Sequence, residues 1–170
     1  KISSNFNLTY NVIEQNCFPI PLLIRKKIIR AIENPKLNFE ELDNLIGKFH
    51  SNCALKLKNT HLLDSIAIHG QTIYHKERIK SLQIGNPKYL YENHKVPIIY
   101  NFRKHDILEN GTGAPLMPYL DWLLLKNTNF SDFTLNIGGI SNITSIPKNT
   151  NRNQVIGFDT GPGMALIDEC

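Results

Sequence analysis

Two stretches in the first third of the chain repeat their apolar residues at the spacing of an amphipathic helix. The first begins at Pro21, a residue type that suits the first turn of a helix, and runs to about Ile32. The second follows Asn38 and Glu41, which match a capping pair. The predicted core-facing positions are Ile20, Leu23, Ile24, Ile28, Ala31 and Ile32 in the first helix, and Leu42, Leu45, Ile46, Phe49, Cys53 and Leu57 in the second.

The rest of the chain alternates short β-type runs with further helical segments. We expect strands at 65–69, 82–84 and 96–100, and helices over 86–94 and 119–125. Residues 1–19 are predicted to be strand and loop, residues 103–117 a long loop, and residues 148–154 a polar surface connector. This order predicts an α/β protein with a mixed β-sheet flanked by helices.

A glycine pair separates two β-rich runs between Thr134 and Ile146. The pattern predicts a β-hairpin with Gly138 and Gly139 at its tip. Glycines at such a tip either supply a positive φ or allow a ligand to approach the backbone, so an ordinary turn and a ligand site are both open.

A second glycine-rich turn follows the apolar pair Val155-Ile156, with the sequence Gly157-Phe158-Asp159-Thr160-Gly161-Pro162-Gly163. A helix is predicted to begin at Met164. Unpaired backbone N–H groups and the helix dipole favour an anion such as phosphate at a turn of this kind. A carboxylate beside phosphate is typical of a metal ligand or of a base in phosphoryl transfer. The alternative is a tight strand-to-helix turn in which Asp159 caps the helix.

The segment His69-Gly70-Gln71-Thr72 follows a short buried-type strand. Side chains at strand ends line the ligand crevice in α/β sheets, and Gln71 and Thr72 have donors and acceptors that suit a sugar or an amide. For His69 we favour a structural role.

The composition is that of an ordinary globular protein, with 41% hydrophobic and 20% charged residues, and it suits one soluble domain. The chain has no run of about 18 apolar residues, so no membrane span is predicted. Its three cysteines are widely spaced and do not suggest a disulfide framework. The charge of +4 is scattered, and its densest group, Arg25-Lys26-Lys27 with Arg30, is interpreted as a solvated helix face. We therefore expect no membrane or nucleic-acid partner.

Five segments together resemble the anhydro-N-acetylmuramic acid kinase family. They are His69–Thr72, Asn101-Phe102-Arg103 with Asp106, Gly113–Leu116, Leu135–Gly139 and Gly157–Gly163. The resemblance implies a ribonuclease-H-like fold of the actin and sugar-kinase superfamily. It implies a cytoplasmic enzyme that uses ATP and Mg2+ to convert 1,6-anhydro-N-acetylmuramic acid and water to N-acetylmuramic acid 6-phosphate in peptidoglycan recycling. The resemblance also admits a homodimer.

The same resemblance assigns roles to individual residues. Asp159 matches the general base for the attacking water, and an ionised carboxylate suits that role. Arg103 matches a position that binds the lactyl carboxylate of the sugar, although a surface ion pair with Asp106 is an equal alternative. The phosphate-facing backbone is assigned to Gly138, Gly139, Gly161 and Gly163, and the sugar contacts to Gln71, Thr72 and Arg103; no metal ligand is assigned.

Some positions depart from the family pattern. Asn101 replaces the usual Asp, Thr112 replaces a Gln, and Met164 replaces an Asn. Another sugar kinase, or a non-catalytic nucleotide-binding protein of the same superfamily, therefore remains an alternative. The family's opening Gly-Thr-Ser-x-Asp-Gly loop is also absent. We expect residues 1–170 to be an internal fragment, a partial N-terminal lobe that lacks activity on its own.

Overall fold

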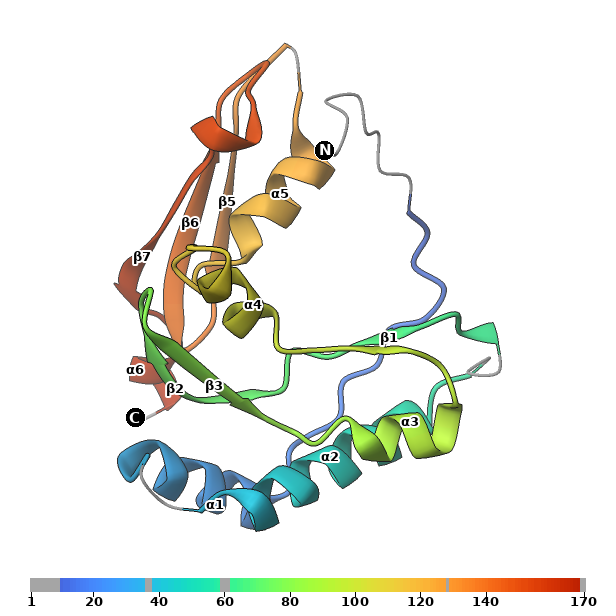
Figure 1. The fold of residues 1–170 in the computed structure, drawn as a ribbon. Coiled ribbons are helices and arrows are strands. Elements are labelled where there is room, and N and C mark those ends of the chain that lie inside the picture. Colours follow the sequence, from blue (N-terminus) through green and yellow to red (C-terminus); the bar gives the residue numbers. More distant parts are fainter. Residues whose placement is uncertain (1–9, 36–37, 59–61, 128, 169–170) are drawn as a thin grey trace. The chain divides into compact units, whose positions relative to one another are not determined.

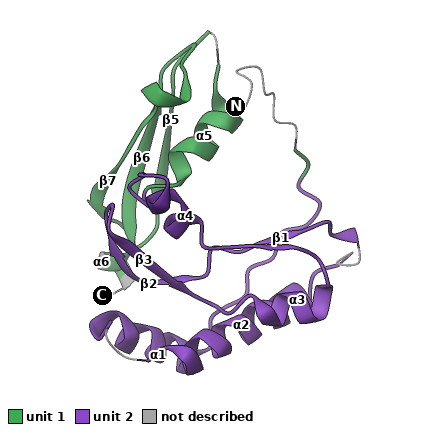
Figure 2. Ribbon diagram, in the orientation of Figure 1, with its two compact units in different colours: residues 1–11, 115–170 green, residues 12–114 purple. Residues whose placement is uncertain are grey.

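The computed structural model describes residues 10–35, 38–58, 62–127 and 129–168. These residues form two compact units, which are coloured separately in Figure 2. Unit 2 spans residues 12–114, and the described part of unit 1 comprises residues 10–11, 115–127 and 129–168. The prediction that the chain forms part of a single lobe stays a prediction, and each unit is described by itself.

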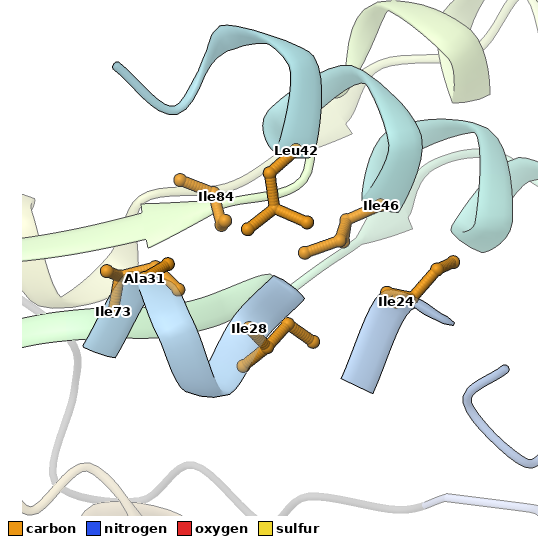
Figure 3. Packing of buried hydrophobic residues seen from close by; sticks show 7 residues of the cluster. All are labelled: Ile24, Ile28, Ala31, Leu42, Ile46, Ile73 and Ile84. Atoms are coloured by element: carbon orange, nitrogen blue, oxygen red, sulfur yellow. The ribbon is translucent and has the colours of Figure 1, made fainter. Parts of the chain in front are cut away.

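Unit 2 begins with two helices, α1 (Leu22–Glu33) and α2 (Glu40–Ala54), at the positions that the apolar spacing predicts. Both helices pack against a β-hairpin of the same unit (Figure 1). Their buried side chains form one cluster with two hairpin residues, as Figure 3 shows; its members are Ile24, Ile28, Ala31, Leu42, Ile46, Ile73 and Ile84. The hydrophobic core of unit 2 therefore lies between the helix pair and the hairpin.

Two details of these helices differ from the sequence prediction. Ile20, Leu23 and Ile32 are exposed, because the buried stripe of α1 is narrower than the six apolar positions suggest. The capping pair does not form either. Asn38 accepts a hydrogen bond from the N–H of Glu40 (2.9 Å), and Glu41 instead forms an ion pair with Lys27.

The hairpin consists of β2 (Gln71–Lys76) and β3 (Lys80–Ile84), which pair antiparallel. The sequence analysis found part of β3 and missed β2. A bulge at Ile73 breaks the simple alternation of β2, and the turn that follows contains Arg78 in the left-handed region with a φ of 58°. Neither feature has the glycine or asparagine that marks a hairpin turn in a sequence.

The remaining strands and helices of unit 2 are short. Strands β1 (Ile66–Ala67) and β4 (Ile98–Ile99) pair parallel, and α3 (Lys88–His94) occupies its predicted place. Helix α4 (Phe102–Leu108) lies at the start of the segment 103–117 that the sequence predicts as a loop, so that prediction is wrong for residues 103–108. Asn101, in the left-handed conformation with a φ of 61°, ends the extended segment and turns the chain directly into α4.

Unit 1 is built on one antiparallel sheet with the strand order β5-β6-β7 and the helix α5 (Met117–Leu125). The strands are β5 (Asp132–Ile137), β6 (Ile140–Ile146) and β7 (Ile156–Pro162); a 3-10 turn at Arg152–Gln154 precedes β7 and a short helix α6 (Ala165–Asp168) follows it. The predicted hairpin over 134–146 is confirmed. Thr134 on β5 donates a hydrogen bond to Asp121 on α5 (2.7 Å), which ties the helix to one face of the sheet.

The prediction of one mixed sheet is not met by the described strands. They form one parallel pair and two antiparallel sheets. Strands that follow each other through a short connection usually pair with each other, and β2–β3 and β5–β6 are such pairs. The coarser prediction, a protein of mixed helices and strands, is confirmed. Within the described ranges, no helix is long and apolar enough to cross a membrane.

Candidate active site

The two glycine-rich turns of unit 1 are hydrogen-bonded to each other. The N–H of Gly163 donates to the carbonyl of Gly139 (2.8 Å), and the N–H of Met164 donates to the carbonyl of Gly138 (2.8 Å). A Cβ atom at Gly163 would overlap the carbonyl oxygen of Gly138, so only glycine permits this approach. The predicted turn over 157–163 is wrong for residues 157–162, because these residues belong to strand β7. Segments that are about twenty residues apart in the sequence still form one structural feature, which we call the paired glycine turns: the hairpin turn at residues 138–139 and the end of β7 with the residue after it, 161–163.

A β-bulge on β7 adjoins these turns. Ser141 pairs with Gly161 and Asn142 with Asp159, so Thr160 is the extra residue of β7. The hydroxyl of Thr160 donates to the carbonyl of Ser141 (3.1 Å), and Gly161 has a φ of 134°, which only glycine adopts readily. Bulges of this kind often change the direction of a side chain beside a functional site.

Asp159 lies in β7 directly before the bulge and is exposed. It pairs across the sheet with Asn142, which in turn pairs with Asn136 on β5. Opposed residues of an antiparallel sheet share a face, so the three side chains form one polar row. The alternative role of Asp159 as a helix cap is wrong, because α6 begins only at Ala165.

The sequence analysis did not single out Asn136 or Asn142 as functional residues. The signal was present, because both lie three residues from Gly139 in Asn136-Ile137-Gly138-Gly139-Ile140-Ser141-Asn142. In a two-stranded hairpin, that symmetry places them opposite each other.

The paired glycine turns leave fewer free donors than the sequence suggests. The N–H groups of Gly138, Gly163 and Met164 all donate to backbone carbonyls. Among the described residues, the N–H of Gly139 has no such acceptor. A Cβ at Gly139 or Gly161 would meet no atom within 4 Å, so the backbone is open at both positions. Since α6 has only four described residues, its dipole adds little.

A second group of predicted site residues lies in unit 2, around Arg103 on α4. Its Nε donates to Nε2 of His69 (2.9 Å), and its Nη1 donates to the carbonyl of Gly113 (2.9 Å). The ring of His69 makes a further hydrogen bond, between Nδ1 and the carbonyl of Gly70 (2.9 Å). Arg103 is half-buried, and this burial lowers its pKa below the ordinary value. It remains charged at neutral pH.

The predicted ion pair between Arg103 and Asp106 is not among the ion pairs of the described residues. Oδ2 of Asp106 accepts a hydrogen bond from the N–H of Gly113 instead (2.7 Å). Its backbone carbonyl accepts the N–H of Gly111 (2.7 Å), so Asp106 organises the loop that follows α4.

Gln71 and Thr72 lie at the start of β2 and are half-buried. The Thr72 hydroxyl contacts Nε2 of Gln83 on β3 (3.3 Å), and that amide also donates to Ser81 (2.7 Å). Oε1 of Gln83 is buried and has no partner among the described residues. Gln83 and His69 both line a pocket of about 180 Å³. The other residues that line it are Asp43, Ile68, Gly70, Ile84, Gly85, Pro87, Tyr100 and Asn101. The structure thus adds Gln83, which the sequence analysis missed because it reads as an isolated polar residue in a short strand.

Open backbone at paired glycine turns, with a carboxylate on the adjoining strand, is typical of proteins that handle phosphate groups. Comparison with known families agrees with this class. Residues 4–170 match the model of the family described as anhydro-N-acetylmuramic acid kinase, and the chain belongs to that family.

Individual relatives support the same assignment. The chain is similar to the anhydro-N-acetylmuramic acid kinase of Haemophilus influenzae, with 35% identity over 97% of this chain and 45% of the relative. The enzyme of that name from Francisella tularensis subsp. novicida is 37% identical over 97% of this chain and 47% of its own length. That from Clostridioides difficile is 47% identical over 65% of this chain and 31% of its own length. The chain therefore spans about half the length of the first two of these relatives.

Proposed function

We propose that this chain takes part in the ATP-dependent conversion of 1,6-anhydro-N-acetylmuramic acid and water to N-acetylmuramic acid 6-phosphate. The observation that carries the proposal is the hydrogen-bonded pair of glycine turns with Asp159 on the adjoining strand, in a chain of this family. A ribonuclease-H-like fold of the actin type, a cytoplasmic location and a homodimer belong to the same proposal, and they rest on the family resemblance alone.

Asp159 is the proposed general base. Its carboxylate is exposed and accepts the proton of the water that attacks the anomeric carbon. A bond forms between that water oxygen and the carbon, while the bond to the bridging oxygen breaks. The freed oxygen then takes the phosphoryl group of ATP, and ADP leaves. Asn142 and Asn136, in the same row, have amide groups that are able to hydrogen-bond the water or the sugar.

ATP, as substrate, is assigned to the paired glycine turns. The open backbone at Gly139 and Gly161, and the N–H of Gly139, fit the approach of a phosphate. Mg2+ in such enzymes is held by one or two carboxylates together with phosphates and water. The described part of the chain has no cluster of three or more His, Cys, Asp or Glu residues that would hold a metal by itself. Asp159 is the acidic side chain nearest in sequence to the turns, and no step of the mechanism depends on the ion.

The sugar is assigned to side chains of unit 2. Arg103 is held by two neutral acceptors and is proposed to bind the lactyl carboxylate. Gln71 and Thr72, on β2, are proposed to contact polar groups of the sugar. Gln83 touches Thr72, so a change at Gln83 is expected to affect the same contacts.

The test is Asp159→Asn in the complete gene product that contains this chain. The amide keeps the shape of the side chain but does not accept a proton, so turnover should fall by about 10²-fold to 10⁴-fold, with ATP binding largely kept. Turnover is measured by ADP release coupled to a detectable reaction, with 1,6-anhydro-N-acetylmuramic acid as the acceptor.

Asp132→Asn is the matched control, because Asp132 lies at the far end of β5, opposite Ile146. It should leave turnover close to that of the wild type. Near-normal turnover of Asp159→Asn would show that Asp159 is not the base. A wild-type protein that binds ATP and phosphorylates no anhydro sugar would favour a non-catalytic nucleotide-binding protein or a kinase for another sugar.

A further inference from the structure

We propose that His69 is a positioning residue that holds Arg103 in place for an anionic group of the sugar, its carboxylate. This inference rests on the proposed function and adds a residue for which the sequence analysis favoured a purely structural role. It is carried by the hydrogen-bond chain that joins Gly70, His69, Arg103, Gly113 and Asp106.

The two contacts of the His69 ring together assign its protonation. The carbonyl of Gly70 only accepts, so Nδ1 must carry a proton to bond it. The Nε of Arg103 only donates, so Nε2 must offer a lone pair. Both bonds exist together only in the neutral imidazole with its proton on Nδ1. His69 is therefore a neutral acceptor for a cation.

The second anchor of Arg103 is also neutral. This anchor is the carbonyl of Gly113, a buried residue with a φ of 78°, which accepts a hydrogen bond from Nη1 of Arg103. Gly113 is itself fixed, because its N–H donates to Asp106. The carboxylate nearest in sequence thus binds the loop backbone and leaves the guanidinium charge uncompensated. Among the hydrogen bonds and ion pairs of the described residues, Arg103 contacts no carboxylate.

This arrangement suits the binding of an anion. A guanidinium group has five N–H donors, and the two anchors use one each. The three that remain are enough for a two-point contact with a carboxylate. Because the side chain is already held at Nε and Nη1, less conformational freedom is lost when a ligand binds.

The first experiment separates positioning from direct contact, with N-acetylmuramic acid, which carries the lactyl carboxylate, as the calorimetric probe and the complete gene product as the protein. Arg103→Ala should weaken binding by about 10-fold to 100-fold, as expected for a lost charged hydrogen bond. His69→Leu removes the acceptor and should weaken binding by about 10-fold. His69→Gln keeps an acceptor and should stay within about 3-fold of the wild type.

The double variant His69→Leu/Arg103→Ala is the decisive one. If His69 acts through Arg103, the double variant should bind N-acetylmuramic acid no more weakly than Arg103→Ala alone. Additive losses would show that His69 contacts the ligand itself or acts elsewhere, and would overturn the proposal. In kinetic assays, His69→Leu should raise the KM for the sugar and leave the KM for ATP unchanged; an equal rise in both would also overturn it.

The second experiment does not depend on kinase activity. Nitrogen-15 NMR of the imidazole should show a proton on Nδ1 of His69 in the wild type. In Arg103→Ala, the Nε2-protonated form should gain population, because its competing donor is gone. A wild-type ring protonated on Nε2 would overturn the inference even if Asp159→Asn supports the kinase. The expected tautomer with no binding of N-acetylmuramic acid to the wild type would count against both proposals.

Discussion

At the scale of single residues, His50 on α2 is the clearest case of a group whose surroundings change its chemistry. Its Nδ1 is buried, with no hydrogen-bond partner among the described residues. Burial lowers the pKa of His50 below its ordinary value, because the charged ring loses hydration. The neutral ring is therefore favoured in the folded protein.

A loss of stability in mild acid follows from this shift. Since the folded pKa lies below the unfolded one, the unfolded chain binds the proton more readily as the pH falls below about 6.5. The contribution of the neutral, buried His50 ring to the free energy of unfolding is fully present above that pH. It declines as the pH falls through the folded pKa of His50. Thermal unfolding measured at about pH 7.5 and about pH 5 should therefore show a smaller decrease in His50→Gln than in the wild type.

His105→Gln is the control, because His105 is exposed on α4. Its pH dependence should follow the wild type. If His50→Gln also followed the wild type, burial of His50 would not be the source of the acid sensitivity. The ion pair of Glu41 with Lys27, which lowers the pKa of Glu41 below its ordinary 4.5, responds only at lower pH and does not enter this comparison.

Residue patterns also set the limit of what the sequence could show about the site. Asp159 and the glycines could be predicted because their spacing is local and few residue types fit such turns. The contact between His69 and Arg103 could not, since it joins residues 34 positions apart and depends on the tautomer of one ring. A sequence gives no local pattern for a hydrogen bond that the fold creates.

At the scale of elements, the same limit explains which helices and strands were found. Helix α1 and the β5–β6 hairpin have regular apolar spacing or a glycine turn, and both lie where predicted. Helix α4 and strand β2 have neither. The first begins with a left-handed Asn101 and the second is broken by a bulge at Ile73. Local irregularities that tertiary contacts stabilise are therefore the source of the errors.

The paired glycine turns give an element-scale prediction, because their glycines occupy different surroundings. A methyl group at Gly163 would overlap the carbonyl of Gly138, whereas one at Gly139 would meet no atom within 4 Å. Gly163→Ala should thus destabilise the protein by about 1–3 kcal/mol, the usual cost of overpacking, and Gly139→Ala should have little effect on stability. Thermal or urea unfolding of both variants measures the difference.

The same pair separates structural from functional roles. If phosphate approaches the open backbone at Gly139, Gly139→Ala should raise the KM for ATP while the melting temperature stays unchanged. Equal stability of the two variants would contradict the close approach of the turns. An unchanged KM for ATP in Gly139→Ala would count against Gly139 as a phosphate-facing residue.

At the scale of the whole molecule, the predicted site residues divide between the two units. Asp159 and the four glycines lie in unit 1, whereas Gln71, Thr72 and Arg103 lie in unit 2.

Within unit 1, one face of the sheet carries exposed aromatic and aliphatic side chains, including Phe133 (67% exposed), Leu135 (61%) and Phe158 (53%). Because an exposed apolar face favours association between chains, the oligomeric state of isolated residues 1–170 is measured, without detergent, together with any affinity.

The final prediction concerns how tightly residues 1–170 alone bind ATP. The described turns present few donors to a phosphate, because Gly138, Gly163 and Met164 already donate to backbone carbonyls. No atom lies within 4 Å of a Cβ at Gly139 or Gly161, so a phosphate there would stay open to solvent, where each charge interaction is weak and screened by salt.

We therefore expect a dissociation constant for magnesium-ATP in the millimolar range or weaker, measured by calorimetric titration of the purified 170-residue chain. Gly139→Ala should weaken this binding further if the site is the one assigned here, and Asp132→Asn should not change it. Micromolar binding by the wild-type chain would mean that donors outside the paired glycine turns hold the phosphates. Such binding would place the nucleotide site at other residues of the chain.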